Sequence, residues 1–387
     1  MFVEKRARRA LAIVVGAAVA ATAFAVPAGA DAKPKKKGQV VKVMTRNVFL
    51  GADLGPGLAA GSIPEFIEAN GGILREVTET DFPRRSRALA AEIRDKKPDL
   101  VGLQEVALWR TATPANLNFL NPDVGPTADT VRYDFLELLM DKVNRGDKKR
   151  YKVAVVQNEF DFEAPADENE VPDDGALDPP FEDAELNGRL TMRDVILVKR
   201  SKRVKFKRPR GGHFANLLEV TVAGALPVPV TRGWTRVEAK VGKGPWFSFT
   251  NTHFEAFDDE TETPSIRQLQ ATETGEPDGY AESNRPTVLV GDLNSDDNSV
   301  AENDQKAFNA LKGFGWKSRS TEDPMSCCVN DLFTAPPSQF DHHIDHVLTR
   351  SPKQVKLLRS SVTGRKQVNG IYPSDHAGVF SKLRIKR

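Results

Sequence analysis

The sequence predicts a mixed α/β fold, in which layered β-sheets carry helices on their outer faces. Three times a helical pattern is followed by an apolar strand, namely 83–97 before 99–106, 133–144 before 151–157, and 266–276 before 287–294. The second half adds short apolar strands at 193–200, 216–224, 235–241, 246–254, 343–349 and 378–385. With 387 residues, 40% of them hydrophobic, the chain is long enough to bury a large core.

The first thirty residues have the three parts of a secretory signal peptide. A basic start is followed by the apolar run LAIVVGAAVAATAFAV, and small residues at Ala28 and Ala30 predict cleavage after Ala30. The run is short and rich in alanine for a membrane span, so an uncleaved N-terminal anchor is the weaker alternative. We therefore expect a signal peptide at 1–30 and a secreted, extracellular protein with no integral membrane segment after cleavage.

The mature chain is expected to start with a flexible leader at 31–40 and to continue as one domain at 41–387. Residues 40–48 are apolar and β-branched between polar flanks, which predicts a buried strand. Residues 83–97 begin with Pro83, place Leu89 and Ile93 one turn apart and end before Pro98. That spacing predicts an amphipathic helix.

The charge balance gives no sign of a dedicated nucleic-acid binder. The full chain has 55 Lys and Arg against 53 Asp and Glu, and residues 1–30 hold four of the basic residues and one acidic residue. The mature chain is therefore close to neutral, whereas nucleic-acid binders usually have a clear basic excess.

Two segments depart from this balance. Residues 159–185 contain twelve Asp or Glu and no Lys or Arg, which predicts a long acidic surface insertion. Lys199–Arg210 has eight basic residues in twelve. We interpret this basic run as a solvated strand edge, where Lys discourages unwanted strand pairing, with a polyanion contact as the alternative.

The two cysteines, Cys327 and Cys328, are neighbours in the sequence. They exclude a disulfide framework and a CxxC metal knuckle. A vicinal disulfide and a pair of packed thiols both remain open.

Polar side chains recur where predicted strands end. They are Asn47, Glu105, His253, Asp292, Asn294, Asp345, Asp375 and His376. Each is weak evidence alone, because a lone carboxylate is usually on the surface and a lone histidine is usually structural. Together they predict one cleft over the edge of a sheet.

This set resembles the endonuclease/exonuclease/phosphatase superfamily, which includes deoxyribonuclease I and neutral sphingomyelinases. Six segments match in order: TRN at 45–47, LQE at 103–105, NTH at 251–253, GDLN at 291–294, IDHVL at 344–348 and SDH at 374–376. The resemblance implies a four-layer α/β sandwich of two packed mixed β-sheets flanked by helices. It also implies a catalytic domain at 41–387 that hydrolyses a phosphate ester with an activated water and Mg²⁺, with Mn²⁺ or Ca²⁺ as alternatives.

The resemblance assigns the metal to three residues. Glu105 is the expected main ligand, with Asn47 and Asp375 nearby. Mg²⁺ prefers hard oxygen ligands and keeps several waters, so few protein oxygens are needed.

The remaining residues are expected to act on the water and the phosphate. His376, oriented by Asp345, would activate the water or hold the phosphate. His253 would stabilise charge or protonate the leaving oxygen, and Asn294 would donate its amide to a phosphate oxygen. Asp292 would align the water or act as the base itself.

Other polar residues near these motifs have expected supporting roles. Asn251 is expected to orient the site from below. Arg193 and Asp194 are interpreted as a structural pair, with a place in the cleft as the alternative. We expect His342, His343 and His346 to be structural or surface residues.

The expected function is a phosphodiesterase, either a nuclease or a phospholipid- and sphingomyelin-type enzyme. Its partner would be a phosphate-ester substrate, and the sequence implies no protein partner. A phosphomonoesterase or a non-catalytic binding module that kept the fold is the alternative. Entry into a lipid surface would need exposed aromatic residues, for which Trp109, Phe119 and Phe135 are candidates.

The segment VGDLNSDDNS at 290–299 has the oxygen spacing of a calcium loop. However, Asp297 occupies the position that needs glycine, and Asn303 the position that needs a bidentate glutamate. We therefore interpret Asp292 and Asn294 as the working pair, and residues 296–298 as the polar turn after them.

Overall fold

A computed structural model describes residues 38–121, 123–146, 149–169, 184–258, 263–297, 305–321, 324–351 and 353–386. Residues 37–387 form one compact unit. The predicted signal peptide and most of the predicted leader lie outside the described residues. Among the helices that are described, none combines the length and the apolar character needed to cross a membrane.

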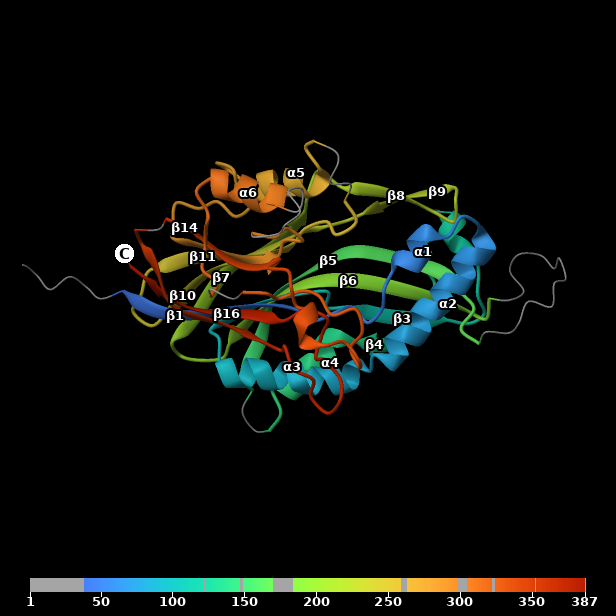
Figure 1. Ribbon diagram of the computed structural model, residues 1–387, viewed down its shortest axis with the longest axis horizontal. Coiled ribbons are helices and arrows are strands. Elements are labelled where there is room, and N and C mark those ends of the chain that lie inside the picture. Colours follow the sequence, from blue (N-terminus) through green and yellow to red (C-terminus); the bar gives the residue numbers. More distant parts are fainter. Residues whose placement is uncertain are drawn as a thin grey trace, which may run out of the picture. The chain divides into compact units, whose positions relative to one another are not determined.

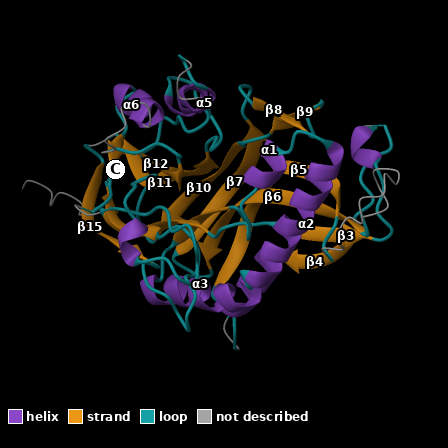
Figure 2. Ribbon diagram, turned by 45° about the vertical axis from the view of Figure 1, so that its right-hand side comes forward, coloured by secondary structure: helices purple, strands orange, loops and turns teal. Residues whose placement is uncertain are grey.

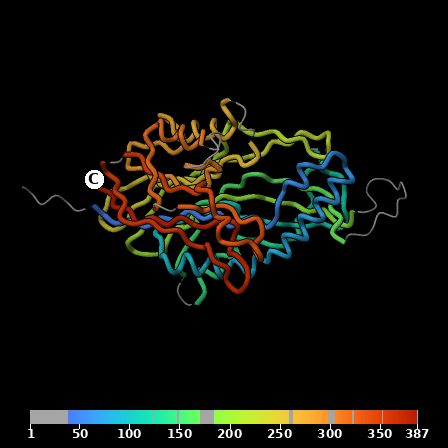
Figure 3. The backbone as a smooth tube through the Cα atoms, in the orientation of Figure 1, coloured from blue at the N-terminus to red at the C-terminus, as the bar shows by residue number. Residues whose placement is uncertain are grey.

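One mixed sheet contains eight strands within the described residues. In spatial order they are β15 (Val355–Thr363), β16 (Gly378–Ile385), β1 (Gln39–Asn47), β2 (Leu100–Gln104), β6 (Leu186–Lys199), β3 (Leu108–Ala112) and β4 (Thr130–Asp134), with β5 (Tyr151–Ala166) also paired to β6. Strands β1 and β2 are parallel, whereas β1 and β16 are antiparallel. The two ends of the domain therefore lie side by side, and the blue β1 runs next to the red β16 in Figure 3.

A second mixed sheet contains six of the described strands. Their order is β13 (Lys317–Ser318), β14 (Asp345–Arg350), β12 (Thr287–Asp292), β11 (Trp246–His253), β10 (Gly233–Val241) and β7 (Val204–His213). Strands β11 and β12 are parallel, and β14 pairs antiparallel with β12. A separate hairpin joins β8 (Leu218–Val222) to β9 (Leu226–Val230).

The two sheets pack face to face over an apolar core. Val43 and Ile196 from the first sheet share this core with Phe249, Val288 and Val290 from the second. Because side chains alternate along a strand, Met44 and Leu289 point to the opposite faces of their sheets. Each sheet is therefore apolar on both faces, and each outer face requires a cover.

Helices cover both outer faces. Helices α2 (Ile63–Glu79), α3 (Phe82–Lys96) and α4 (Phe135–Val143) pack on the first sheet, and α5 (Ile266–Gly275) and α6 (Lys306–Gly313) pack on the second. Figures 1 and 2 show α3 on one side of the strands and α5 with α6 on the other. The short helix α1 (Gly55–Ala59) precedes α2, and two 3-10 turns lie at Asn118–Leu120 and Pro337–Gln339. The arrangement is the expected four-layer sandwich.

Local side-chain signals set the helix ends. Asp81 caps α3 by accepting from the Arg84 backbone N–H at 3.0 Å, and Pro83 lies in its first turn. Ser265 caps α5 in the same way, accepting from the Gln268 N–H at 3.3 Å. These caps satisfy backbone donors that a helix leaves unpaired at its start.

Two predicted boundaries differ from the structure. Strand β1 begins at Gln39, inside the predicted leader, because Gln39 and Val40 pair with Ile385 and Arg384. Strand β5 runs to Ala166, so the first eight residues of the predicted acidic insertion belong to the sheet. Residues 170–183 of that segment lie outside the described residues.

The basic run Lys199–Arg210 lies largely on β7, which is an edge strand of the second sheet. Lys207 and Arg208 pair with Glu238 on the neighbouring β10, at 3.3 and 2.7 Å. This placement fits the interpretation of a charged strand edge, and the polyanion contact stays an untested alternative.

Candidate active site

The strand ends of both sheets meet at one edge of the sandwich. Asn47 ends β1, directly across from Gln104, the last residue of β2. In the second sheet, His253 at the end of β11 lies across from Asp292 at the end of β12, and Asp292 faces Asp345 at the start of β14. The turn before β16 adds Asp375 and His376, which completes the predicted set.

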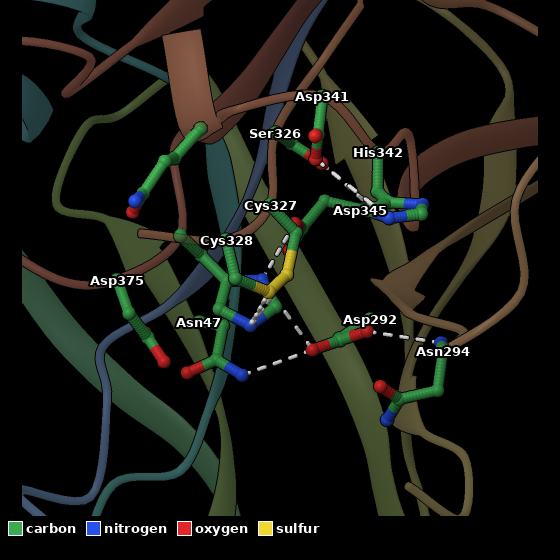
Figure 4. The surroundings of a disulfide bond; sticks show 12 residues. Asn47, Asp292, Asn294, Ser326, Cys327, Cys328, Asp341, His342, Asp345 and Asp375 are labelled. Carbon is green, nitrogen blue, oxygen red and sulfur yellow. Dashed lines mark hydrogen bonds and ion pairs between the residues drawn. A yellow bond between two sulfur atoms is a disulfide. The ribbon is translucent and has the colours of Figure 1, made fainter. Parts of the chain in front are cut away.

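Asn47 links the two sheets through its side-chain amide. Its Nδ2 donates to Glu105 Oε1 at 2.8 Å and to Asp292 Oδ2 at 2.9 Å, while its Oδ1 accepts from the Phe49 N–H at 2.9 Å. Figure 4 shows Asn47 pointing at Asp292. In this orientation Asn47 positions the two carboxylates, and its Oδ1, which accepts one hydrogen bond, keeps a second lone pair for a metal.

Glu105 is held at the cleft by its backbone and by one N–H. Its φ of 56° lies in the left-handed region, which is rare for a residue with a side chain and is typical of functional positions. Its Oε2 accepts from the Leu50 N–H at 2.8 Å, so both carboxylate oxygens already have a donor.

His376 and Asp345 form a buried pair. His376 Nδ1 lies 2.8 Å from Asp345 Oδ2 and 3.6 Å from Asp292 Oδ2. Asp345 is fully buried, and its Oδ1 has no hydrogen-bond partner among the described residues. A carboxylate on Nδ1 fixes the imidazole tautomer and leaves Nε2 available for chemistry.

The other ring nitrogen of His376 faces sulfur. The structure places Cys327 and Cys328 as a vicinal disulfide, one of the two alternatives that the sequence left open. Their Sγ atoms lie 3.6 and 3.7 Å from His376 Nε2. Figure 4 shows this disulfide beside Asn47 and Asp292, within the candidate site.

His253 is oriented by an arginine that the sequence reasoning missed. The Nη1 of buried Arg232 lies 3.2 Å from His253 Nδ1, and Arg232 also pairs with buried Glu255 at 3.4 Å. A guanidinium only donates, so Nδ1 faces a donor, while Nε2 faces Asp292 Oδ2 at 3.6 Å and the Asn294 amide at 3.1 Å. Burial, followed by Arg232, lowers the pKa of His253 well below its ordinary value, which keeps the ring neutral.

Asn294 and Asn251 support the site from two sides. Asn294 donates from its backbone N–H to Asp292 Oδ1 at 3.0 Å, and its Nδ2 donates to the Phe254 carbonyl at 3.0 Å. The same Nδ2 lies 3.1 Å from His253 Nε2. Asn251 is buried beneath the site and donates to the Leu103 carbonyl at 3.1 Å, in agreement with its expected orienting role.

The carboxylates of this cluster repel one another. Burial, with a further contribution from Asp345, raises the pKa of Asp292 to about 7. Burial and Glu105 raise the pKa of Asp375 to about 6. Burial opposes the charging of His376, but Asp345, Asp292 and Asp375 outweigh it and raise the pKa of His376 well above its ordinary value.

In a cation site without its ion, neighbouring carboxylates repel one another, and this repulsion raises their pKa values. One ligand atom from each of Glu105, His253 and Asp292 lies within 4.8 Å of the others, and the same holds for Asp292, Asp345 and His376. The unpartnered Asp345 oxygen belongs to the second group. The residues present therefore fit a divalent metal, as the family resemblance implied.

The side chains of Arg193 and Asp194 lie in different environments. Arg193 donates to the Val106 carbonyl at 2.8 Å and pairs with Asp134 at 2.7 Å, so it is structural. Asp194 is buried without a hydrogen bond to any described residue, and burial raises its pKa well above the ordinary value. Burial, with a further contribution from Asp194, raises the pKa of Glu159 to about 10.

A cavity of about 570 Å³ opens beside Glu105 and Asp375. Its acidic lining residues are Asp53, Glu76, Glu79, Glu105, Asp331 and Asp375, and its aromatic ones are Phe49, Phe160, Phe257 and Phe333. Among the described residues, Arg232 is its one basic lining residue. A second cavity, of about 750 Å³, lies between α3 and β15 and does not include the strand-end residues.

Two sequence-based interpretations are corrected. Trp109 and Phe135 are buried in the core, and Phe119 packs against Phe66 and Phe162, so these aromatic residues are not a membrane-entering surface. Asp296 is not part of a solvated turn, because it is buried and accepts from the His343 N–H at 3.1 Å.

A two-sheet sandwich with carboxylates, amides and imidazoles at its strand ends defines a metal-dependent phosphoesterase. The chain belongs to the Endonuclease/Exonuclease/phosphatase family, whose model matches residues 68–376. Members of this family are metal-dependent hydrolases of phosphate esters, and that is the enzyme class of this chain.

Solved structures with the same fold come from distant relatives. A family protein from Bacteroides thetaiotaomicron is 14% identical, with a TM-score of 0.52 over 91% of this chain and 100% of that chain. A mannosyl-6-phosphatase from the same organism is also 14% identical, with a TM-score of 0.50 over 89% of this chain and 99% of that one. At this identity the likeness shows the fold alone. No curated protein sequence matches the chain.

Proposed function

We propose that the protein is a secreted, Mg²⁺-dependent phosphodiesterase that acts on a compact diester rather than on duplex nucleic acid. The observation that carries this proposal is the combination of the Asp292–Asp345–His376 cluster with an acid-lined cavity directly beside it.

The metal would be held by Glu105 and Asp375, with Asn47 fixing the Glu105 carboxylate from the side. When bound, a divalent cation neutralises phosphate charge and lowers the pKa of an attacking water. A phosphate ester is anionic and repels hydroxide, so positive charge at this point is the first requirement of hydrolysis.

The protein's own groups would supply the proton steps. His376, held at Nδ1 by Asp345, would hold the phosphate as an imidazolium, because Asp345, Asp292 and Asp375 raise its pKa well above the ordinary value. Asp292 would then align the attacking water or act as the base. His253 presents Nε2 beside Asp292, so a proton at Nε2 would let it donate a hydrogen bond to a phosphate oxygen or to the leaving oxygen. Asn294, whose amide borders His253 Nε2, is placed to do the same.

The cavity favours a diester with no further negative charge. A phosphomonoester carries close to two negative charges at pH 7 and a nucleic acid carries many, whereas the described lining offers a single arginine among several carboxylates. Binding of a polyanion there would place phosphates next to unneutralised acids. Phe257 and Phe333 are 44% and 42% exposed at this cavity and could contact an apolar or ring-shaped group. A phospholipid head group with a neutral or cationic substituent matches this chemistry.

Secretion rests on the signal-peptide pattern of residues 1–30. The Cys327–Cys328 disulfide is compatible with an oxidising compartment, where disulfides persist.

The test is a substrate panel with the purified mature chain. It contains bis-p-nitrophenyl phosphate, p-nitrophenyl phosphate, sphingomyelin micelles, RNA and plasmid DNA, each with Mg²⁺, Mn²⁺, Ca²⁺ or EDTA. We expect turnover of the small diester and of sphingomyelin with Mg²⁺, and loss of both in Glu105→Ala. Preference for the monoester would favour a phosphomonoesterase, and no turnover of the small diester or of sphingomyelin in any metal would contradict the proposal.

A further inference from the structure

A second group of metal-ligating side chains lies outside the candidate active site. His343 and His346 flank Asp345, but His346 points to the opposite face of β14 because side chains alternate along a strand. There its ring stacks on Phe308 of α6, with centroids 4.7 Å apart. The half-buried Asp297, in the loop after β12, completes the group.

The hydrogen bond at one ring nitrogen of His346 decides whether the other ring nitrogen carries a proton. Its Nε2 lies 2.9 Å from the Ser295 carbonyl oxygen, which can only accept. The neutral ring therefore carries its proton on Nε2. Its Nδ1 therefore presents a lone pair, and this buried atom has no hydrogen-bond partner among the described residues.

His343 has the same arrangement. Its Nε2 lies 3.1 Å from Ser320 Oγ, and its buried Nδ1 lies 2.8 Å from Asp297 Oδ1 without the direction of a hydrogen bond. The two imidazole rings are 4.2 Å apart, and one ligand atom from each of the three residues lies within 4.8 Å of the others. Both rings therefore have an outer oxygen at Nε2 and turn Nδ1 inward.

We propose that Asp297, His343 and His346 form a binding site for a divalent transition-metal ion, with Zn²⁺ as the best match. Two imidazole nitrogens and one carboxylate suit zinc, whereas Mg²⁺ and Ca²⁺ prefer oxygen alone. Metal-bound histidines usually donate their other N–H to an oxygen, as both rings can here. The 21% exposed Asp297 side chain marks the open side, where a water can serve as a fourth ligand.

Such an ion would brace the active-site framework without taking part in the reaction. The ion would join two segments of the active-site framework. One is the loop that follows Asp292, the last residue of β12, and the other is the start of β14, whose first residue is Asp345. The proposal is independent of the phosphodiesterase function, because it concerns only the three ligands and their ion.

The experiment measures zinc bound to the metal-free mature protein in excess Mg²⁺, which competes for oxygen-rich sites and not for imidazoles. Wild type is compared with Asp297→Asn, with His343→Gln and with His342→Gln. His342 is the matched control, because it is the neighbouring histidine and its side chain is 47% exposed. Bound zinc is counted after gel filtration, and the Tm is recorded with and without zinc.

We expect wild type and His342→Gln to retain one more zinc ion per chain than Asp297→Asn and His343→Gln. We also expect zinc to raise the Tm of the first two proteins alone, and Co²⁺ to give them the strong visible absorption of a tetrahedral site. Asp297 is partly exposed, so Asp297→Asn should fold even where a histidine variant does not. Equal zinc content in all four proteins, or a wild-type Tm that does not respond to zinc, would overturn the proposal.

Discussion

Asp292 and Asp345 stand directly opposite each other where β12 pairs with β14, and His376 Nδ1 approaches both carboxylates, at 3.6 and 2.8 Å. The shorter contact identifies Asp345 as the residue that orients His376. Asp292 is the shared centre of the site, because it also accepts from Asn47 and lies 3.6 Å from His253 Nε2.

Replacing Asp345 by asparagine should remove the orientation and the charge that His376 needs. We expect kcat to fall by about 10²–10⁴-fold, the usual contribution of a general acid or base, with a smaller change in KM. The matched control is Asp341→Asn, because Asp341 is nearby in the chain and 67% exposed. Steady-state kinetics on a small diester measure both, and an undiminished kcat in Asp345→Asn would rule out the dyad.

Replacing Arg232 by lysine should keep the buried charge beside Glu255 but lose the directed donor to His253 Nδ1. We expect kcat to fall about tenfold or more, because His253 would no longer be held in one orientation and would contribute less to catalysis. Lysine is chosen because complete removal of the cation would leave Glu255 buried and unpaired, which is strongly destabilising. A pH–rate profile identical to that of wild type would show that Arg232 does not set the state of His253.

Mg²⁺ should stabilise the protein more at pH 8 than at pH 5. The folded-state pKa values of about 7 for Asp292 and about 6 for Asp375 exceed the ordinary value of about 3.9 for an aspartate. Between about pH 4 and pH 7 the folded state thus binds more protons than the unfolded state, and metal-free stability falls as pH rises. The raised pKa of His376 acts in the same direction.

Thermal unfolding in EDTA and in Mg²⁺ at the two pH values measures this effect. Protonation of Asp375, a proposed ligand, and of Asp292 beside the site should weaken metal binding, so the rise in Tm caused by Mg²⁺ should be larger at pH 8. In Asp375→Asn the difference between the two pH values should shrink. A rise in Tm that is independent of pH would contradict the proposed ligand set.

A dithiol reductant should slow the enzyme. It would convert the Cys327–Cys328 disulfide into two thiols while becoming a disulfide itself. The new sulfur groups would face His376 Nε2 at the present distance of 3.6–3.7 Å, and the imidazolium would favour a thiolate there that competes with the phosphate. The Cys327→Ala/Cys328→Ala variant serves as the control, because its rate should not change with reductant. Equal sensitivity in both proteins would locate the effect elsewhere.

Reversing charge at the cavity should shift substrate preference. Glu79 and Asp331 are exposed lining residues, so Glu79→Lys with Asp331→Lys should raise the rate on plasmid DNA relative to a small diester. The gain should weaken at high salt, because exposed charges are screened. Glu68→Lys changes the charge of an exposed α2 residue outside the cavity lining and should leave the preference unchanged. The same DNA preference in both variants would indicate a general charge effect.

The sequence predicted the strand-end residues well, because each follows or precedes an apolar run that can only be a buried strand. Asn47, Glu105, His253, Asp292, Asn294, Asp345 and His376 converge as expected, and Asp375 borders the same cavity. The roles assigned to them stay predictions until they are tested by mutation.

Other parts could not be predicted, because their signals are tertiary. Arg232 has no motif, and its role arises only because Gly233 on β10 pairs with His253 on β11. Helix α2 was missed because Gly71 and Gly72 interrupt its apolar spacing. Gly71 is required by packing, since a Cβ at that position would collide with the backbone of Asp167. No local pattern could have shown that contact.

The alternation along β14 has a consequence for engineering. Asp345 points toward the cleft, and its neighbour His346 points toward α6. If the register of β14 shifted by one residue, the imidazole would face the cleft and the carboxylate would face α6. The exposed residues Asp341 and His342, which lead into the strand, should therefore tolerate substitution better than any odd-numbered insertion or deletion in this segment. Loop grafts between family members would need to preserve the parity of this segment as well as its sequence.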